Sequence, residues 1–434
     1  MTDLWGRTHR YNGQKRGPKR RKACKVLAWF QLLKPCLEAQ PDNGQFHVNA
    51  PTKGEVFRWY QRDRALYPTI FPEVHPKYFN QVWRELIPEI KLRKVLRFTR
   101  CKTCEALREK AFDCSASQME RSMARCTLEH HYRFVKRERA EALRKAMEAV
   151  MRSWDALSIA IDGTSQLPRG LPQFGRNLHG EEKSINRLHH HMTLVVVHGL
   201  GTRCYVNRDN VASDPNSTVE VLQRTLQWVE DQRGRLPGKL YIQVDNCWRE
   251  NKNSTFLNFC ASLVERGLFE YGIEVAFLPV GHTHNEVDQV ASRISVAVRR
   301  RDVKTPSALY AILREGFPEM DVIVLQNVAD TKKFLNPSGK PEWTGSRWKP
   351  IHNVTEHRYF RFSRDAQQTL VLHHKADVDS EYGHPYYPLK GTGPHASQQE
   401  FTKRVLQADG YGTNAWKRTK EEGNKLGKSS DEVY

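Results

Sequence analysis

Between residues 156 and 300, the apolar and polar positions predict an ordered series of strands and helices. Short apolar runs indicate buried strands, and longer stretches with apolar residues three and four positions apart indicate amphipathic helices. The predicted strands are Leu157–Asp162, Met192–His198, Thr202–Asn207, Lys239–Asp245 and Glu274–Val280. The predicted helices are Ser217–Gln232, Ser254–Arg266 and His284–Arg300.

This order of elements predicts an α/β fold. Three successive strands, followed by strands that alternate with helices, indicate a mixed sheet flanked by helices. It is also the order found in RNase H-like folds, so we expect residues 154–304 to form an RNase H-like core. A helix at Ser307–Phe317 and later strand-like pieces predict a small C-terminal α+β appendage over residues 305–393. Residues 394–434 are mostly polar and are expected to form a tail.

The chain before residue 154 is predicted to be helical, in a module that covers residues 51–153. Helices are expected at Gly54–Arg64, Pro76–Lys94 and Thr127–Arg152. The first two resemble a helix-turn-helix that reads DNA, although any small helical bundle gives the same pattern. Residues 1–50 are predicted to form a basic flexible arm.

Charge favours a nucleic-acid partner. The formal net charge is +20, and residues 1–100 hold 21 Lys and Arg against 8 Asp and Glu. A phosphate backbone attracts such a basic region because each neutralised phosphate releases a counterion. A merely soluble or ribosomal-type basic surface is the alternative. The residues expected to bind nucleic acid are Lys15, Arg16, Lys19, Arg20, Arg21 and Lys22, a run that also resembles a nuclear-import signal and predicts a nuclear protein.

No apolar run approaches the roughly 20 residues that a membrane helix needs. The first residues also carry no signal-peptide hydrophobic stretch. We therefore expect no membrane partner.

Two aspartates end predicted strands, Asp162 in LSIAID and Asp245 in LYIQVD. Carboxylates at the carboxyl ends of neighbouring strands lie at the sheet edge where open α/β sheets place ligands. Oxygen ligands of this kind suit Mg²⁺ or Mn²⁺. Two such ions could activate a water or hydroxyl and stabilise the leaving oxygen of a phosphodiester.

A third acid is expected on the helix that follows the last strand, where Glu286 and Asp288 compete. Thr283-x-x-Glu286 matches a capping box, which gives Glu286 a structural role. Asp288 has no such role in this interpretation and shares a helix face with His284. We therefore favour Asp288 as the third acid.

Several polar residues near these acids are expected to support the site. Asn246, His282, His284 and Glu286 could contact the ion, the substrate or the carboxylates. Loop histidines that hydrogen-bond only to backbone groups are the alternative for His282 and His284.

A cysteine segment predicts a structural zinc site. Cys101 and Cys104 form a CxxC pair, and Cys126 precedes His130 and His131. Two cysteines with a further Cys and His match a closed tetrahedral Zn²⁺ site. On a helix, Cys126 and His130 point the same way, which favours His130 as the ligand.

The runs DNCWRENKN (Asp245–Asn253) and GHTHNEVDQVASRIS (Gly281–Ser295) resemble a eukaryotic family of transposase-derived proteins of unknown function. That family carries a DN…ENKN motif followed by GHTHxxxDQxxSR. The resemblance covers roughly residues 79–316 and implies the RNase H-like fold of DDE/DDD transposases and integrases. It implies Asp162, Asp245 and Asp288 as catalytic, magnesium-binding acids in DNA strand cleavage and transfer.

The same resemblance extends to the cysteine segment. The family's zinc-knuckle module resembles FTRCKTCEAL (Phe98–Leu107), and this likeness implies His131 as the zinc ligand. Spacing from Cys126 favours His130, so the choice between the two histidines stays open. Transposases of this class usually form dimers or larger assemblies, which implies a homo-oligomer that acts on DNA, with RNA as an alternative.

Two other functions compete with strand cleavage. A catalytically inactive transposase-derived protein would keep the fold and bind DNA without cutting it. The GHTH run also resembles a loop of metallophosphoesterases, but that class needs an Asp-x-His and an Asn-His pair, and this sequence has neither.

Overall fold

The computed structural model describes a chain whose contacts divide it into two compact units, Met1–Lys136 and Arg137–Tyr434. We call these the N-terminal and C-terminal units. The described residues are 18–39, 45–48, 50, 52–92, 101–113, 115–164, 170–176, 187–188, 190–207, 211–283 and 285–390.

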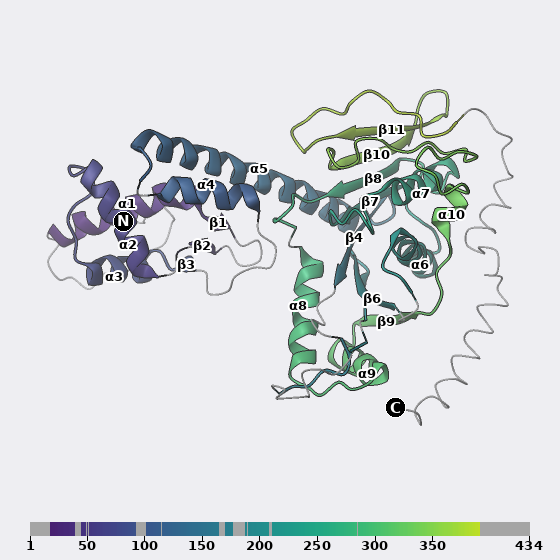
Figure 1. The fold of residues 1–434 in the computed structure, drawn as a ribbon, viewed down its shortest axis with the longest axis horizontal. Helices are drawn as coiled ribbons and strands as arrows, with labels where there is room; N and C mark the ends of the chain where they lie inside the picture. The colour runs from purple at the N-terminus through teal and green to yellow at the C-terminus, as the bar shows by residue number, and fades with distance from the viewer. Residues whose placement is uncertain are drawn as a thin grey trace. The chain divides into compact units, whose positions relative to one another are not determined.

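The N-terminal unit is mainly helical, as predicted. Its elements are α1 (Pro18–Leu33), the 3-10 turn η1 (Lys34–Cys36), β1 (Glu38–Ala39), β2 (Phe46–Val48), α2 (Lys53–Leu66), α3 (Pro76–Leu86), β3 (Ile90–Leu92), α4 (Lys102–Phe112) and the first part of α5 (Gln118–Met151). The three short strands form a sheet in the order β1-β2-β3. Figure 1 shows α1, α2 and α3 gathered around one another.

Aromatic side chains build the core of this unit. Trp29 and Phe30 of α1 lie in one buried cluster with Tyr60 of α2 and with Phe79 and Trp83 of α3. The indole of Trp29 donates to Oδ2 of Asp63 at 2.8 Å, so this buried carboxylate has a partner. Because α1 supplies core residues, residues 18–33 form an ordered helix, where the sequence predicted a flexible arm.

Helix α3 is shorter than the sequence predicted. It ends at Leu86, whereas the apolar spacing predicted a helix as far as Lys94. Pro88 explains the difference, because the residue before a proline is pushed out of the helical region. The apolar residues that follow continue as strand β3.

The C-terminal unit is built on one large sheet. Its strands are β4 (Ala156–Thr164), β5 (Met192–Val197), β6 (Gly201–Asn207), β7 (Lys239–Val244), β8 (Gly272–Phe277), β9 (Met320–Leu325), β10 (Tyr359–Arg364) and β11 (Leu370–Lys375). Its helices, besides the end of α5, are α6 (Pro215–Arg233), α7 (Ser254–Glu265), α8 (Glu286–Arg299), α9 (Pro306–Gly316) and α10 (Thr331–Leu335). The strand order is β11-β10-β8-β7-β4-β5-β6-β9.

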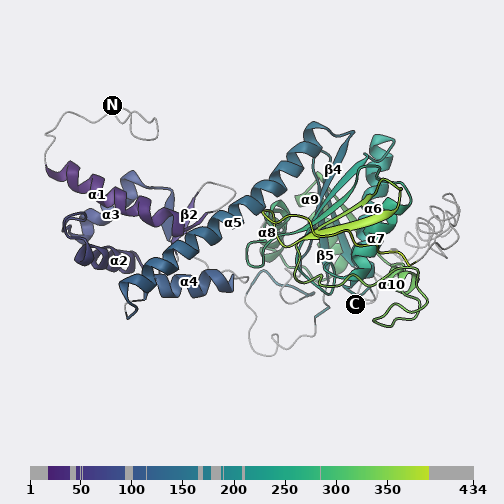
Figure 2. The same ribbon diagram turned by 90° about the horizontal axis from the view of Figure 1, so that it is seen from above.

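Parallel and antiparallel neighbours make this sheet mixed. Strand β7 runs parallel to both β4 and β8, whereas β5 runs antiparallel to β4 and β6. Alternate strand residues, such as Ile159 of β4 and Ile242 of β7, pack with α6 and α7 on one face. Residues of α8 and α9 join a second apolar cluster, which contains Ala160 and Leu194. Figures 1 and 2 show α6 and α7 together on one side of the sheet and α8 on the other.

These features confirm the predicted fold class, an α/β mixed sheet flanked by helices with a helical N-terminal region. The predicted strands and helices between residues 156 and 300 all occur, with ends shifted by a few residues at most. The C-terminal region differs from the expectation. Strand β9 pairs with β6 at one side of the sheet, and β10 pairs with β8 at the other. The C-terminal strands therefore extend the main sheet and do not form an appendage of their own.

Within the described residues, no helix is both long enough and apolar enough to cross a bilayer.

Candidate active site

Asp162 and Asp245 occupy corresponding positions on two neighbouring parallel strands. Ile161 of β4 pairs with Val244 of β7, so each aspartate is the next residue along its strand direction. Neighbouring strands lie about 4.8 Å apart. Ile161 and Val244 are buried in the cluster under α6 and α7. Because side chains alternate along a strand, both aspartates face the other side of the sheet.

Two more carboxylates, those of Asp288 and Glu250, lie near Asp162. Burial, together with the nearby carboxylates of Asp245, Asp288 and Glu250, raises the pKa of Asp162 to about 8. The pKa of Glu250 is also raised, first by burial and then by Asp245. Asp245 and Asp288 therefore both lie within electrostatic reach of Asp162, as does Glu250, which the sequence analysis did not select.

Asp245 is held by the loop that follows it. Its Oδ1 accepts from the backbone N–H of Cys247 at 3.0 Å and from the side-chain amide of Asn251. Asn251 is buried, and its Oδ1 accepts from the hydroxyl of Thr218 on α6 at 3.1 Å. These contacts fix the Asp245 carboxylate through Asn251 to helix α6.

Asn246, predicted as a supporting residue, serves the loop instead of Asp245. Its amide donates to the carbonyl of Leu278, and its Oδ1 accepts from Nζ of Lys252 at 3.1 Å. Burial, with a smaller contribution from Arg358, lowers the pKa of Lys252 to about 8. Asn246 therefore ties the end of β7 to the segment after β8.

The start of α8 differs from the prediction in a way that concerns the third acid. The N-cap is Asn285, and a capping box joins it to Asp288. Oδ1 of Asn285 accepts from Asp288 N–H at 3.3 Å, and Oδ2 of Asp288 accepts from Asn285 N–H at 3.0 Å. The predicted Thr283–Glu286 capping box is wrong because the helix begins two residues later. Asp288 has the structural role that was assigned to Glu286, and it still lies close enough to Asp162 to raise its pKa.

Glu286, the competing acid, pairs with a histidine. Its Oε1 lies 2.6 Å from Nε2 of His198, whose Nδ1 faces the hydroxyl of Ser158 at 3.0 Å. Burial opposes ionisation of Glu286, but the bond to His198 outweighs it and lowers the pKa of the carboxyl.

His191 is a further site residue that the sequence analysis missed. Its Nε2 lies 3.6 Å from Oε2 of Glu250. Burial lowers the pKa of His191, although Asp245 acts in the opposite direction. Gly163 explains how these groups approach β4, because a Cβ there would lie 3.0 Å from Oε2 of Glu250 and 3.1 Å from the His191 ring. The signal in the sequence was weak: His191 directly precedes β5, which runs antiparallel beside β4.

Of the two histidines in the GHTH run, only His282 belongs to the described residues. His284 lies outside the described residues. His282 is buried, its N–H donates to the carbonyl of Pro279 at 2.9 Å, and its carbonyl accepts from Arg139 at 3.4 Å. A supporting role for His282 at the acids stays a prediction.

In the N-terminal unit, the CxxC pair meets one histidine. The ligand atoms of Cys101, Cys104 and His131 lie within 4.8 Å of one another, and they could hold a metal ion. Cys101 Sγ is 3.4 Å from His131 Nε2. His130 and Cys126 are exposed, and Cys126 is outside this group. The prediction of Cys126 as a ligand is therefore corrected, because its position on α5 turns it to solvent.

The basic residues expected to bind nucleic acid fall into two sets. Lys15 and Arg16 lie outside the described residues, and the other four belong to helix α1. Arg21 and Lys22 are exposed, and Nζ of Lys22 donates to the carbonyl of Glu73 at 3.2 Å. Nothing in the described structure tests their role in binding.

Comparisons with known proteins add a family match. Residues 180–380 match a domain of unknown function (DUF7869). This range contains Asp245, Glu250 and Asp288 and begins after Asp162. No curated protein matches. A search of solved structures finds similarity to the Mos1 transposase paired-end complex with left transposon end, at 12% identity and a TM-score of 0.30. The similarity covers 72% of this chain and 83% of that chain.

Proposed function

We propose that this protein is a transposase-derived enzyme that cleaves and joins DNA strands with divalent metal ions. The observation that carries the proposal is the convergence of Asp162, Asp245 and Asp288 in the C-terminal unit. Two lie side by side where parallel strands end, and the third lies in the first turn of a helix. Buried strands and a helix cap hold these carboxylates, so the site is rigid before a substrate arrives.

The donor set fits a Mg²⁺ or Mn²⁺ ion. Such ions prefer oxygen ligands, and the carboxylates here supply them. Burial and repulsion from the neighbouring carboxylates together raise the pKa of Asp162 to about 8. A cation would offset that repulsion and keep every carboxylate ionised at neutral pH. When bound, it would activate the attacking water or hydroxyl and stabilise the leaving oxygen.

The chain's own residues have distinct tasks in this proposal. Asn251 and the N–H of Cys247 hold the Asp245 carboxylate in one rotamer. The Asn285 cap orients Asp288. Glu250, with His191 beside it, adds a fourth carboxylate that could bind the ion or orient the attacking group.

Four further expectations belong to the same proposal. The net charge of +20 favours DNA as the partner, with the basic residues of α1 as contacts. We propose a nuclear protein that acts as a homo-oligomer. We also propose that Cys101, Cys104 and His131 hold a structural Zn²⁺, for which tetrahedral coordination requires a fourth ligand.

The test is cleavage of labelled duplex DNA in Mg²⁺ or Mn²⁺, with Asp245→Asn beside the wild type. Asp231→Asn is the matched control, because it removes the same charge from an exposed position near the end of α6. We expect cutting by the wild type and the control, and none by Asp245→Asn, which should still bind DNA. If none of the three proteins cuts and all bind DNA in a salt-sensitive manner, a catalytically inactive DNA-binding protein replaces this proposal.

A further inference from the structure

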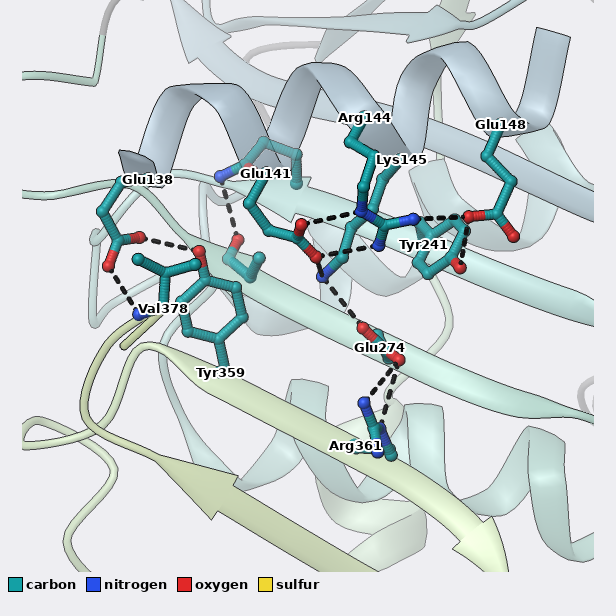
Figure 3. Close-up of polar contacts among 12 residues, drawn as sticks. Glu138, Glu141, Arg144, Lys145, Glu148, Tyr241, Glu274, Tyr359, Arg361 and Val378 are labelled. Atoms are coloured by element: carbon teal, nitrogen blue, oxygen red, sulfur yellow. Dashed lines mark hydrogen bonds and ion pairs between the residues drawn. The ribbon is translucent and has the colours of Figure 1, made fainter. Parts of the chain in front are cut away.

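A polar cavity lies in the C-terminal unit, and none of the three aspartates lines it. It has a volume of about 200 Å³ and lies between the second part of α5 and strands β7, β8, β10 and β11. Figure 3 shows the charged side chains of α5 directed at the sheet. Every lining residue is charged or a tyrosine: Glu141, Arg144, Lys145, Glu148, Lys239, Tyr241, Glu274, Tyr359, Arg361, Lys375 and Tyr382.

Positive charge exceeds negative charge in this lining. Five basic side chains face three acidic ones, an excess of two positive charges. Arg144 is matched, because its guanidinium donates to Glu141 and Glu148 of the same helix at 2.8 Å. The excess therefore lies among the cations that reach in from the strands.

One carboxylate, that of Glu274, forms ion pairs with three of the cations. Glu274 lies 2.9 Å from Lys145, 3.1 Å from Arg361 and 3.7 Å from Lys239 (Figure 3 draws the first two contacts). Burial opposes ionisation of Glu274, but the three cations outweigh it and lower the pKa of the carboxyl. Lys145 has a second carboxylate in Glu141, at 3.6 Å, whereas Lys239 and Arg361 share Glu274 as their ion-pair partner, so the group keeps room for another anion.

Lys375 adds a further positive charge beside this group. Within the described part of the chain, no carboxylate lies at ion-pair distance from it. Its Nζ donates to the carbonyl of Val378 at 3.0 Å and lies 5.0 Å from the centre of the Tyr382 ring. Arg361 contacts the same ring at 4.2 Å. Tyr382 thus holds Arg361 and Lys375 at one side of the cavity.

We propose that this cavity binds a phosphate group. A guanidinium and two ammonium groups around one small, polar space match the charge and the acceptor oxygens of phosphate. Lys239 and Tyr241 lie on the face of β7 that carries Asp245. Tyr241 is four residues before Asp245, which places it about 13 Å away along an extended strand. The bound phosphate is therefore distinct from the one at the acids, and the inference goes beyond the proposed catalytic function. The phosphate could belong to a nucleic-acid backbone or to a free phosphorylated molecule.

Calorimetric titration of the full chain with inorganic phosphate tests the proposal. The double variant Arg361→Gln with Lys375→Gln should bind at least tenfold more weakly, since the loss of even one charged hydrogen bond costs about 1.4 kcal/mol. The matched control is Lys332→Gln with Lys333→Gln, which removes the same charge from exposed positions on α10. Lys375→Gln alone is the second variant if the double variant does not fold, because it leaves the contacts of Glu274 in place.

The outcomes separate the possibilities. Phosphate binding that the control keeps and the cavity variants lose supports the proposal. If a short single-stranded oligonucleotide then displaces the phosphate, the source is a nucleic-acid backbone, and if it does not, the source is a free phosphorylated molecule. Equal binding by all the proteins, or none by the wild type, would overturn the proposal and leave these residues as ion pairs that attach α5 to the sheet. Asp245→Asn should bind phosphate normally, so failure of the catalytic proposal would be seen separately.

Discussion

Asn251 donates its side-chain amide to Oδ1 of Asp245, and this contact connects the proposed metal site to the helix behind it. Asn251 is itself fixed by Thr218 of α6. Residues that orient a metal ligand in this way are typically worth 10- to 100-fold in metal affinity or activity.

The first prediction follows from that contact. Asn251→Ala should weaken Mn²⁺ binding about 10- to 100-fold, because Asp245 loses the donor that fixes its rotamer. Asn253→Ala is the control, since Asn253 caps α7 through Phe256 N–H and donates to the carbonyl of Trp248, and its loss should cost stability without changing metal affinity. Mn²⁺ titration of both variants gives the answer. Equal affinities for the two variants would show that Asn251 does not act through Asp245.

A second prediction concerns the space beside β4. Gly163→Ala should abolish cleavage and lower the free energy of unfolding by about 1–3 kcal/mol, as overpacking does. The new methyl group would displace Glu250 and the His191 ring, which lie 3.0 and 3.1 Å from its position. Gly316→Ala is the control, because nothing lies within 4 Å of a Cβ there. Cleavage assays and urea unfolding of both variants are the measurements. Full activity in Gly163→Ala would show that Glu250 and His191 take no part in cleavage.

The third prediction is a dependence of stability on pH when no divalent ion is added. The pKa of Asp162 is about 8 in the folded protein, against 3.8 as the ordinary value. Between these values the folded state holds one proton more than the unfolded chain, so the contribution of Asp162 to the free energy of unfolding falls as the pH rises. Asp162→Asn should therefore stabilise the protein more at pH 8 than at pH 5. Denaturant unfolding at both pH values measures this, and an equal effect at both would contradict the raised pKa.

The fourth prediction separates the two adjacent histidines of α5. His131→Ala should lose bound zinc, because His131 lies 3.4 Å from Cys101 Sγ. His130→Ala should keep about one Zn²⁺ per chain, because His130 is exposed to solvent. Elemental analysis of purified variants distinguishes them. Loss of zinc from both, or no zinc in the wild type, would contradict the assignment.

The segment between residues 156 and 300 could be predicted in detail because its signals are local. The apolar run of β7 and the 3.6-residue period of α7 are legible without any knowledge of the fold. Asp162 and Asp245 were found for the same reason, since each lies near the end of such a run. The prediction failed where a single residue set the end of an element, as Pro88 did for α3.

The parts of the site that could not be predicted depend on contacts between distant segments. Glu250 and His191 lie 59 positions apart in numbering, and they meet only because of how β5 and the loop after β7 are arranged around Gly163. The cap of α8 posed a different difficulty. Thr283 and Asn285 are both good N-caps, and only the geometry of the chain after β8 decides between them.

Strands β9 and β10 lie at opposite sides of the five strands β4 to β8, and this has a consequence for shortened versions of the protein. A chain that stopped at residue 304 would keep the three aspartates but would leave β6 and β8 with unpaired backbone along their outer sides. Such open strands pair readily with other molecules. The smallest soluble fragment that contains the three aspartates should therefore extend through Lys375. A domain swap with another protein would have to move the whole sheet.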